Sequence, residues 1–148
     1  MGALPKVNLE VVGRVDGVEL CDLYDSVGWS AYTGDPGALA KAVANSTYVV
    51  VARVGRRLIG LGRGLSDDVS IFYLQDLLVR PEWQGRGVGR ALLGDCLERF
   101  AHVRQKVLLT DDEAAQHRFY ESLGYRDTAA SGGTRLHAFV QIQGLDRD

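Results

Sequence analysis

The sequence predicts a single α/β (α+β) domain over residues 1–148, and three observations support this fold class. A length of 148 residues is typical of one compact domain with a sizeable core. The composition, 46% hydrophobic and 24% charged, is that of an ordinary globular protein. Strand-like and helix-like segments follow one another in the order β-α-α-β-β-β-α-β-α-β-β, without a repeat or a linker between them.

The N-terminal part begins with a strand and two helices. Asn8–Val15 is predicted to be the strand, and the apolar residues of Val18–Val27 recur near helical spacing. After a loop over residues 28–34, Asp35 is placed to cap a second helix and Pro36 to occupy its first position. We expect this helix to end near residue 45.

Three strands come next in the predicted order. Tyr48–Val54 and Leu58–Leu65 are joined by a tight turn, and Ile71–Val79 is too apolar to have one face in water. Glycines 60, 62 and 64 lie inside the second of these strands. Glycine in a strand indicates a bulge or close backbone packing.

The C-terminal part alternates helices and strands. A helix that starts near Val88 has one apolar stripe, made by Leu92, Leu93, Cys96, Leu97 and Phe100. Val107–Thr110 is predicted to be a short buried strand, and Glu113–Leu123 a helix that ends at Gly124. A strand begins at Tyr125, and after a glycine-containing loop Leu136–Ile142 is the last strand.

The most informative stretch is Gln84-Gly85-Arg86-Gly87-Val88-Gly89, between an apolar strand and a helix. Glycines let the backbone approach an anion, and the N–H groups of the first helical turn point at it. The helix dipole adds roughly half a positive charge there. The spacing matches neither the P-loop G-x-x-x-x-G-K-[ST] nor the dinucleotide motif G-x-G-x-x-G. The stretch therefore predicts a site for another phosphorylated cofactor.

The string Q-x-x-G-x-G, with Leu77–Trp83 before it and Arg90–Leu93 after it, resembles the pyrophosphate loop of the GNAT superfamily of N-acetyltransferases. The resemblance implies a mixed, mostly antiparallel central sheet flanked by helices, with acetyl-CoA as co-substrate and no metal. It also implies which residues hold the cofactor. The strand residues Leu77, Leu78 and Val79 offer backbone groups to the pantetheine arm, and the loop residues Gln84, Gly85, Arg86, Gly87, Val88 and Gly89 hold the pyrophosphate. A strand that serves only the core is the alternative for Leu77–Val79, and both can hold.

The segment Phe119–Tyr125 resembles the F-Y-x-x-x-G-F/Y segment of the same superfamily. The resemblance implies that Tyr120 lies near the cofactor sulfur and acts as general acid, because a phenol is protonated at neutral pH. The alternative is a ring that only packs in the core. Glu113 stands where the family often has asparagine, which puts a cofactor contact of that type in doubt.

Asp76 is the first candidate for the general base. A carboxylate in an apolar run is costly unless it is paired or functional, and burial would raise its pKa. Equally, Asp76 could pair with an arginine such as Arg63. Simple alternation puts Tyr73, Gln75 and Leu77 on the other face, where Tyr73 or Gln75 could bind substrate or hold a relaying water. A bulge would change this arrangement.

The acceptor site is predicted from the N-terminal segment. The segment 23–32, together with Asp76–Val79, resembles the branch that includes the plastid serotonin N-acetyltransferases. Trp29 and Tyr32 could form an aromatic wall, and Asp22 or Asp25 could attract an ammonium. The alternative is that Trp29 plugs the core and the aspartates are solvated. A small aryl- or alkylamine is the favoured acceptor; the alternatives are a protein lysine or N-terminus, a non-catalytic acyl-CoA sensor and a nucleotide-binding module.

Charge and composition narrow the function classes. A formal net charge of −2 argues against a general nucleic-acid surface. Cys21 and Cys96 match no metal-ligand spacing, and the sequence has neither a signal peptide nor an apolar run of membrane-spanning length. We therefore expect a cytoplasmic transferase that acts on a small-molecule amine, without nucleic-acid or membrane partners. A homodimer is compatible with these expectations.

Overall fold

The computed structural model describes residues 5–145, which form two units, 5–109 and 110–145. The first unit contains β1 (Val7–Val11), α1 (Gly17–Ser26), α2 (Pro36–Ala44), β2 (Tyr48–Val54), β3 (Arg57–Ser66), β4 (Ile71–Val79), the 3₁₀ turn η1 (Pro81–Trp83), α3 (Val88–Arg99) and β5 (Gln105–Leu108). The second unit contains α4 (Ala114–Ser122). The expectation of one domain over residues 1–148 stays a prediction.

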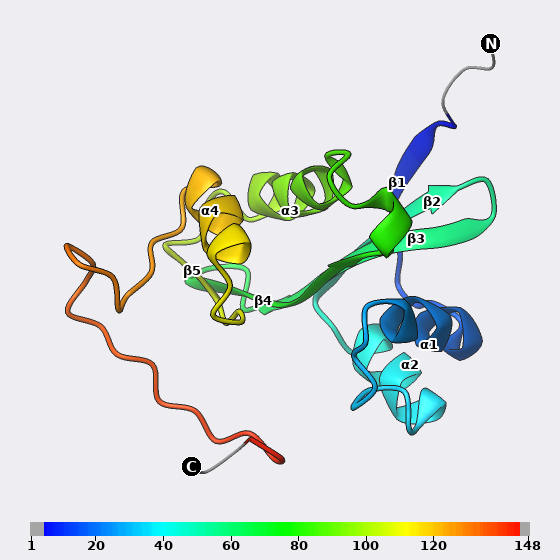
Figure 1. The fold of residues 1–148 in the computed structure, drawn as a ribbon, viewed down its shortest axis with the longest axis horizontal. Helices are drawn as coiled ribbons and strands as arrows, with labels where there is room; N and C mark the ends of the chain where they lie inside the picture. The colour runs from blue at the N-terminus through cyan, green and yellow to red at the C-terminus, as the bar shows by residue number, and fades with distance from the viewer. Residues whose placement is uncertain (1–4, 146–148) are drawn as a thin grey trace. The chain divides into compact units, whose positions relative to one another are not determined.

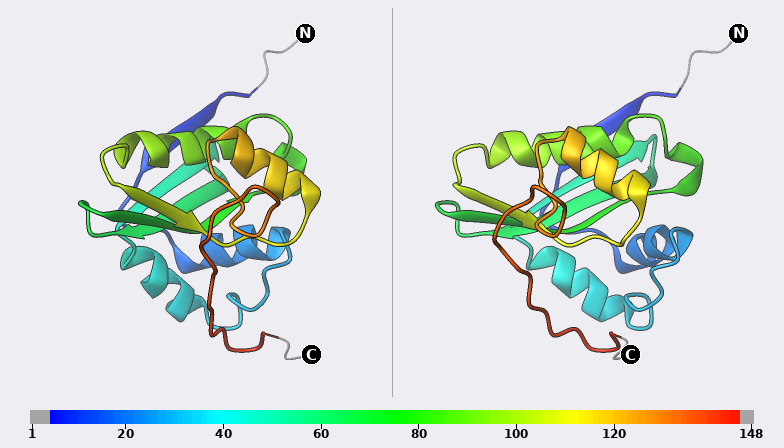
Figure 2. Two further views of the ribbon diagram at one scale, coloured as in Figure 1. Left: turned by 90° about the vertical axis from the view of Figure 1, so that its left-hand side faces the viewer. Right: turned by 60° about the vertical axis from the view of Figure 1, so that its left-hand side comes forward.

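The first unit is a five-stranded sheet in the order β1-β2-β3-β4-β5. Strands β1 to β4 pair antiparallel, and β5 is parallel to β4. The predicted mixed, mostly antiparallel sheet is thus confirmed. Helices α1 and α2 lie on one face of the sheet and α3 lies on the other (Figures 1 and 2).

The face under α1 and α2 carries the main hydrophobic core. Helix α1 begins at Gly17, one residue before the predicted start, and α2 begins at Pro36 as predicted. Asp16 caps α1 by accepting a hydrogen bond from the N–H of Glu19 (3.2 Å), and Asp35 caps α2 by accepting one from the N–H of Ala38 (3.1 Å). Each helix turns its apolar stripe to the sheet. The core cluster consists of Val15, Leu20, Leu23, Tyr24, Leu39, Val43, Val49, Val51, Leu58, Leu61 and Leu78.

The face under α3 is packed closely because β3 is built with glycines. A Cβ at Gly60 would lie 3.0 Å from Cδ1 of Leu92, and one at Gly62 would lie 3.7 Å from Sγ of Cys96. The rings of Phe72 and Phe100 stack with centroids 4.5 Å apart. Cys96 is buried here, and burial raises the pKa of its thiol to about 12, so it is an inert core residue.

Strand β4 contains a bulge at Gln75. Arg63 pairs with Asp76 while its neighbour Gly64 pairs with Leu74, so Gln75 has no partner in β3. The consequence is a change of face. Phe72 packs against α3, whereas Leu78 lies in the core cluster under α1 and α2, although even spacing would put both on one face of a regular strand.

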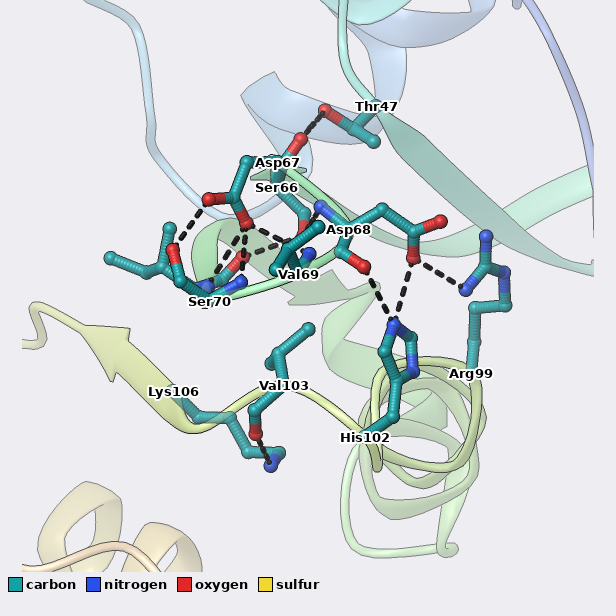
Figure 3. Close-up of polar contacts among 11 residues, drawn as sticks. Thr47, Ser66, Asp67, Asp68, Val69, Ser70, Arg99, His102, Val103 and Lys106 are labelled. Carbon is teal, nitrogen blue, oxygen red and sulfur yellow. Dashed lines mark hydrogen bonds and ion pairs between the residues drawn. The ribbon is translucent and has the colours of Figure 1, made fainter.

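The turn between β3 and β4 is tied to the C-terminal end of α3 (Figure 3). The Asp67 carboxylate accepts hydrogen bonds from the hydroxyl and N–H of Ser70, and these hold the pKa of Asp67 well below its usual range. The Asp68 carboxylate receives the guanidinium of Arg99 at 3.1 Å and Nε2 of His102 at 3.0 Å. These contacts fix the end of the sheet where β4 and β5 begin.

The second unit differs from the sequence prediction. Helix α4 is followed by its C-cap Leu123 and by Gly124, whose φ of 95° is left-handed, as expected for a residue that terminates a helix. The two predicted strands after it, one beginning at Tyr125 and one over residues 136–142, are wrong: the described part of this segment contains no strand. Its backbone bonds are local, such as the N–H of Gly133 to the carbonyl of Ala130 (2.8 Å). Apolar residues at alternate positions fit a strand, but no partner ladder forms, and Phe139 is 93% exposed.

We predict that Gly64→Ala destabilises the fold. A Cβ at Gly64 would lie 2.3 Å from Cε2 of Phe72 and 2.7 Å from the carbonyl oxygen of Tyr73, so the strand opposite must shift. We expect a loss of about 1–3 kcal/mol in the free energy of unfolding. Gly62→Ala is the matched control, because its nearest contact would be 3.5 Å. Urea denaturation measures both, and equal stability of the two variants would contradict the packing described here.

Candidate functional site

One edge of β4 is open in the first unit. The ladder between β4 and β5 runs only from Ile71 paired with Gln105 to Leu74 paired with Leu108. Residues 75–79 of β4 extend beyond it, and on their other side they stay paired with β3 as far as Gly60 opposite Val79. Alternate N–H and C=O groups of Leu77–Val79 therefore point away from β3, without a strand of residues 5–109 to receive them. An extended chain with amide groups fits this edge.

The glycine loop continues directly from that edge. After η1, residues 84–87 form a turn in which Gly85 and Gly87 have φ values of 74° and 84°, and Gly87 is the N-cap of α3. The first hydrogen bond within the helix runs from the N–H of Ala91 to the carbonyl of Gly87 (3.0 Å). The N–H groups of Val88 and Gly89 thus have no partner within the helix, which is the arrangement that binds phosphate.

Two side chains brace this loop. The amide of Gln84 donates a hydrogen bond to the carbonyl of Val79 (2.9 Å), so Gln84 ties the loop to the end of β4, and the Val79 carbonyl is engaged. The guanidinium of Arg86 lies 5.0 Å from the centre of the Trp83 ring. Arg86 is exposed beside the helix N-terminus, where it adds a positive charge.

Asp76 is part of a buried polar cluster under α1. Nε of Arg63 and the hydroxyl of Tyr24 both donate to Oδ2 of Asp76 at 2.7 Å. Asp76 is only 3% exposed and Arg63 only 6%. Burial lowers the pKa of Arg63, but Asp76 and Tyr24 outweigh it and raise that pKa overall. The alternative that Asp76 pairs with Arg63 is confirmed.

The other carboxylate oxygen faces the loop between α1 and α2. The hydroxyl of Tyr32 donates to Oδ1 of Asp76 (3.4 Å), and the amide of Gln75 donates to the Tyr32 oxygen (3.5 Å). Trp29 and Tyr32 are half-buried, and their ring centroids lie 5.9 Å and 5.3 Å from that of Tyr24. Tyr32 thus reaches the Asp76 carboxylate, whereas Trp29 contacts the Tyr24 and Tyr32 rings and packs against the core cluster.

The bulge corrects the expected faces of β4. Simple alternation put Tyr73, Gln75 and Leu77 opposite Asp76. Gln75 instead contacts the Tyr32 oxygen, and Asp76 and Tyr32 contribute to the raised pKa of Tyr73, whose largest cause is burial. Leu77 lies on the α3 side, with its Cδ1 3.5 Å from where a Cβ of Gly62 would be. The extra residue at the bulge therefore brings Tyr73 and Gln75 to the same side as Asp76.

Two residues of this region lie outside the sequence-based candidates. Tyr24 follows helical spacing like a core residue, and its polar partner becomes visible only in three dimensions. Arg80 is buried; its Nε donates to the carbonyl of Leu58 (2.7 Å) and its Nη2 to Asp22 (2.5 Å). This anchors α1 to the end of β4, and it engages the Asp22 carboxylate that was a candidate for attracting an ammonium.

Tyr120 lies in the second unit, on α4. Its ring makes edge contacts with Phe119 and Tyr125, at centroid distances of 5.1 Å and 6.0 Å. Burial raises the pKa of its phenol, so Tyr120 is protonated at neutral pH. The proton needed by a general acid is therefore present.

Among residues 5–145, no group of three or more His, Cys, Asp or Glu side chains is arranged to hold a metal ion. No helix in that range is both long enough and apolar enough to cross a bilayer.

A family model and several known proteins are similar to this chain. The family model for the acetyltransferase (GNAT) domain matches residues 22–141. Histone acetyltransferase TAP1 of Glycine max is 29% identical over 138 residues, which cover 84% of this chain and 58% of that protein. The chain therefore spans little more than half of that relative.

Solved structures share the fold. A GNAT family acetyltransferase from Streptococcus pneumoniae superimposes with a TM-score of 0.79 and 24% identity, covering 94% of this chain and 99% of that one. An aminoglycoside acetyltransferase from an uncultured soil sample, crystallised with sisomicin, gives a TM-score of 0.66 and 18% identity over 93% of this chain and 97% of that one.

We predict that Arg63→Met strongly destabilises the protein, because it leaves the Asp76 carboxylate buried without its ionic partner. The expected loss in the free energy of unfolding is about 3–5 kcal/mol, and Arg63→Met with Asp76→Asn should recover most of it. Arg53→Met is the matched control: its partner Glu19 is 37% exposed, so the loss should be at most about 1 kcal/mol. Denaturant titration compares the variants, and a loss for Arg63→Met no larger than the control would show that the pair is not buried as described.

Proposed function

The chain belongs to the GNAT acetyltransferase family, and on that premise we propose that it transfers an acetyl group from acetyl-CoA to a primary amine by direct attack on the thioester. The observation that carries the proposal is the continuity of the open edge of β4 with the glycine loop. The edge suits an amide-containing arm and the loop suits a pyrophosphate, and coenzyme A has these two groups in this order.

The donor site is built mainly from backbone. Leu77 and the N–H of Val79 face the open edge and pair with the pantetheine arm, and Leu78 between them holds the edge in place through its pairing with β3. The loop from Gln84 to Gly89 encloses the pyrophosphate, with the N–H groups of Val88 and Gly89 and the charge of Arg86 directed at it. Gln84 acts through its brace to Val79 rather than by touching the phosphate.

Acetyl-CoA supplies an activated acetyl group as a thioester. N–H groups at the open edge of β4 polarise its carbonyl and stabilise the oxyanion that forms there. Tyr120, protonated at neutral pH, gives its proton to the departing thiolate as general acid. Asp76 is the final acceptor of the proton that the amine loses before attack.

A small amine is the favoured acceptor. Tyr32, Tyr73 and Gln75 are half-buried near the carboxylate, and Trp29 packs against Tyr32. They offer aromatic faces and one amide, which suits an aryl- or alkylamine. The sisomicin complex of the aminoglycoside acetyltransferase is consistent with a small amine acceptor. A protein lysine or N-terminus is the second candidate, because the Glycine max relative is described as a histone acetyltransferase.

We propose a cytoplasmic enzyme without nucleic-acid or membrane partners; the formal net charge of −2 and the absence of a large excess of basic residues support this. We also propose that the enzyme forms a homodimer, and sedimentation measures its oligomeric state.

An acceptor screen tests the proposed reaction. The protein and acetyl-CoA are incubated with amines, amino acids and peptides, and the released thiol is detected. With the best acceptor, Tyr120→Phe should lower kcat by roughly 10²-fold or more, in the range of a lost general acid, with the affinity for acetyl-CoA unchanged. Full turnover by Tyr120→Phe would remove its role as general acid. If none of the acceptors leads to thiol release, the result would favour the acyl-CoA sensor over the enzyme.

A further inference from the structure

Asp76 is too enclosed to touch an acceptor amine directly. Its Oδ2 accepts two hydrogen bonds of 2.7 Å, from Arg63 and from Tyr24, and both donors are buried. Tyr24 keeps its proton at neutral pH, since burial and the nearby Asp76 charge raise the pKa of its phenol far above the usual range. Oδ2 is therefore occupied by donors that solvent does not reach.

Oδ1 has a different neighbour. The hydroxyl of Tyr32 donates to it at 3.4 Å, and among the three groups on the carboxylate only Tyr32 is partly exposed. The amide of Gln75 donates to the same phenol oxygen at 3.5 Å and so orients the hydroxyl toward Oδ1. Both bonds are long, as is usual for catalytic contacts before substrate binds.

We propose that the Tyr32 hydroxyl is a catalytic proton relay between the acceptor's ammonium and Oδ1 of Asp76. The inference rests on the proposed acetyl transfer and assigns Tyr32 a role beyond lining the acceptor site. Arg63 and Tyr24 are positioning residues, because they hold the carboxylate through Oδ2 and leave Oδ1 for the relay.

The relay balances protons and electrons. One N–H bond of the ammonium breaks, its electron pair stays on nitrogen, and the proton passes to the Tyr32 oxygen. The phenol O–H bond breaks at the same time and its proton goes to Oδ1, so Tyr32 ends neutral and Asp76 ends as a carboxylic acid. The second proton, which nitrogen loses when the C–N bond forms, balances the proton that the thiolate takes up. Asp76 later returns its proton to solvent by the same route.

The surrounding charges suit this sequence. Arg63 from β3 pairs with the Asp76 carboxylate through Oδ2 at 2.7 Å. Tyr24 from α1 and Tyr73 from β4 are the other titratable groups facing the cluster. Burial, then Asp76, raises the pKa of both phenols, so neither changes charge near neutral pH. Since Asp76 and Arg63 together carry no net charge, the site does not hold the ammonium by a free anion, and proton removal is the step in which the cluster contributes.

Two amines distinguish a Tyr32 hydroxyl that relays a proton from a Tyr32 ring that only packs in the site. 2-Phenylethylamine is almost wholly protonated at pH 7 and must lose a proton before attack, whereas aniline is neutral and needs no relay. Tyr32→Phe keeps the ring and removes the hydroxyl. For 2-phenylethylamine, we expect kcat at pH 7 to fall by roughly 10²-fold, in the range of general-base catalysis, with KM changed less than threefold. The defect should shrink as pH rises and the free amine becomes abundant, and with aniline kcat should change less than about threefold.

Tyr48→Phe is the matched control. The Tyr48 hydroxyl also donates to a carboxylate, Oδ2 of Asp95 at 2.6 Å, but on the α3 side of the sheet, where Tyr48 meets Phe100. Tyr48→Phe should leave kcat for both amines, and the dependence of kcat on pH, unchanged. Gln75→Met, which removes the amide that orients Tyr32, provides a second test and should give a smaller loss with the same dependence on amine and pH.

The outcomes are distinct. If Tyr32→Phe lowers kcat equally for both amines, or by a factor that does not change with pH, the relay is overturned. The proposed acetyl transfer would still stand. A wild-type protein that releases thiol with neither amine would instead contradict the small-amine acceptor on which the relay depends. Thermal unfolding of each variant verifies that the fold is kept.

Discussion

The extra residue at Gln75 in β4 determines which side chains face which helices. Before it, Phe72 packs under α3; after it, Asp76 and Leu78 lie under α1 and α2. The bulge can form because Gly64, in the opposite strand, has no side chain where the Phe72 ring lies. Removing one residue here would move Asp76 to the other face of the sheet, away from Arg63, Tyr24 and Tyr32.

The same strand serves both halves of the proposed reaction. Its edge is open from residue 75 because the ladder with β5 ends at Leu74, and its last residue is joined to the glycine loop through Gln84. Its side chains on the α1 side carry the acceptor chemistry. A buried ion pair gives weak stability in itself, but a broken one is costly, so Arg63 and Asp76 hold the strand and the helices in one arrangement.

Local patterns predicted most elements of the first unit. β2 and β4 were predicted to the residue, because apolar runs between turn residues have clear ends, and α2 was marked by Asp35 and Pro36. The position of the bulge could not be predicted, since it depends on the pairing of Gly64 with Leu74. The Tyr24–Asp76 contact joins residues 52 positions apart, which no local spacing reveals. The C-terminal strands were predicted from local pattern, and a local pattern does not supply a pairing partner.

Calorimetric titration of acetyl-CoA into the wild-type protein and Arg86→Glu, with ATP and NAD as competing ligands, tests the central claim most directly. We predict stoichiometric binding of acetyl-CoA, no comparable binding of ATP or NAD, and for Arg86→Glu a dissociation constant raised at least tenfold, about 1.4 kcal/mol. Arg104→Glu, a charge reversal at another exposed position, should bind like wild type. Absence of acetyl-CoA binding, or equal binding of ATP, would contradict the assignment of the edge and loop to coenzyme A.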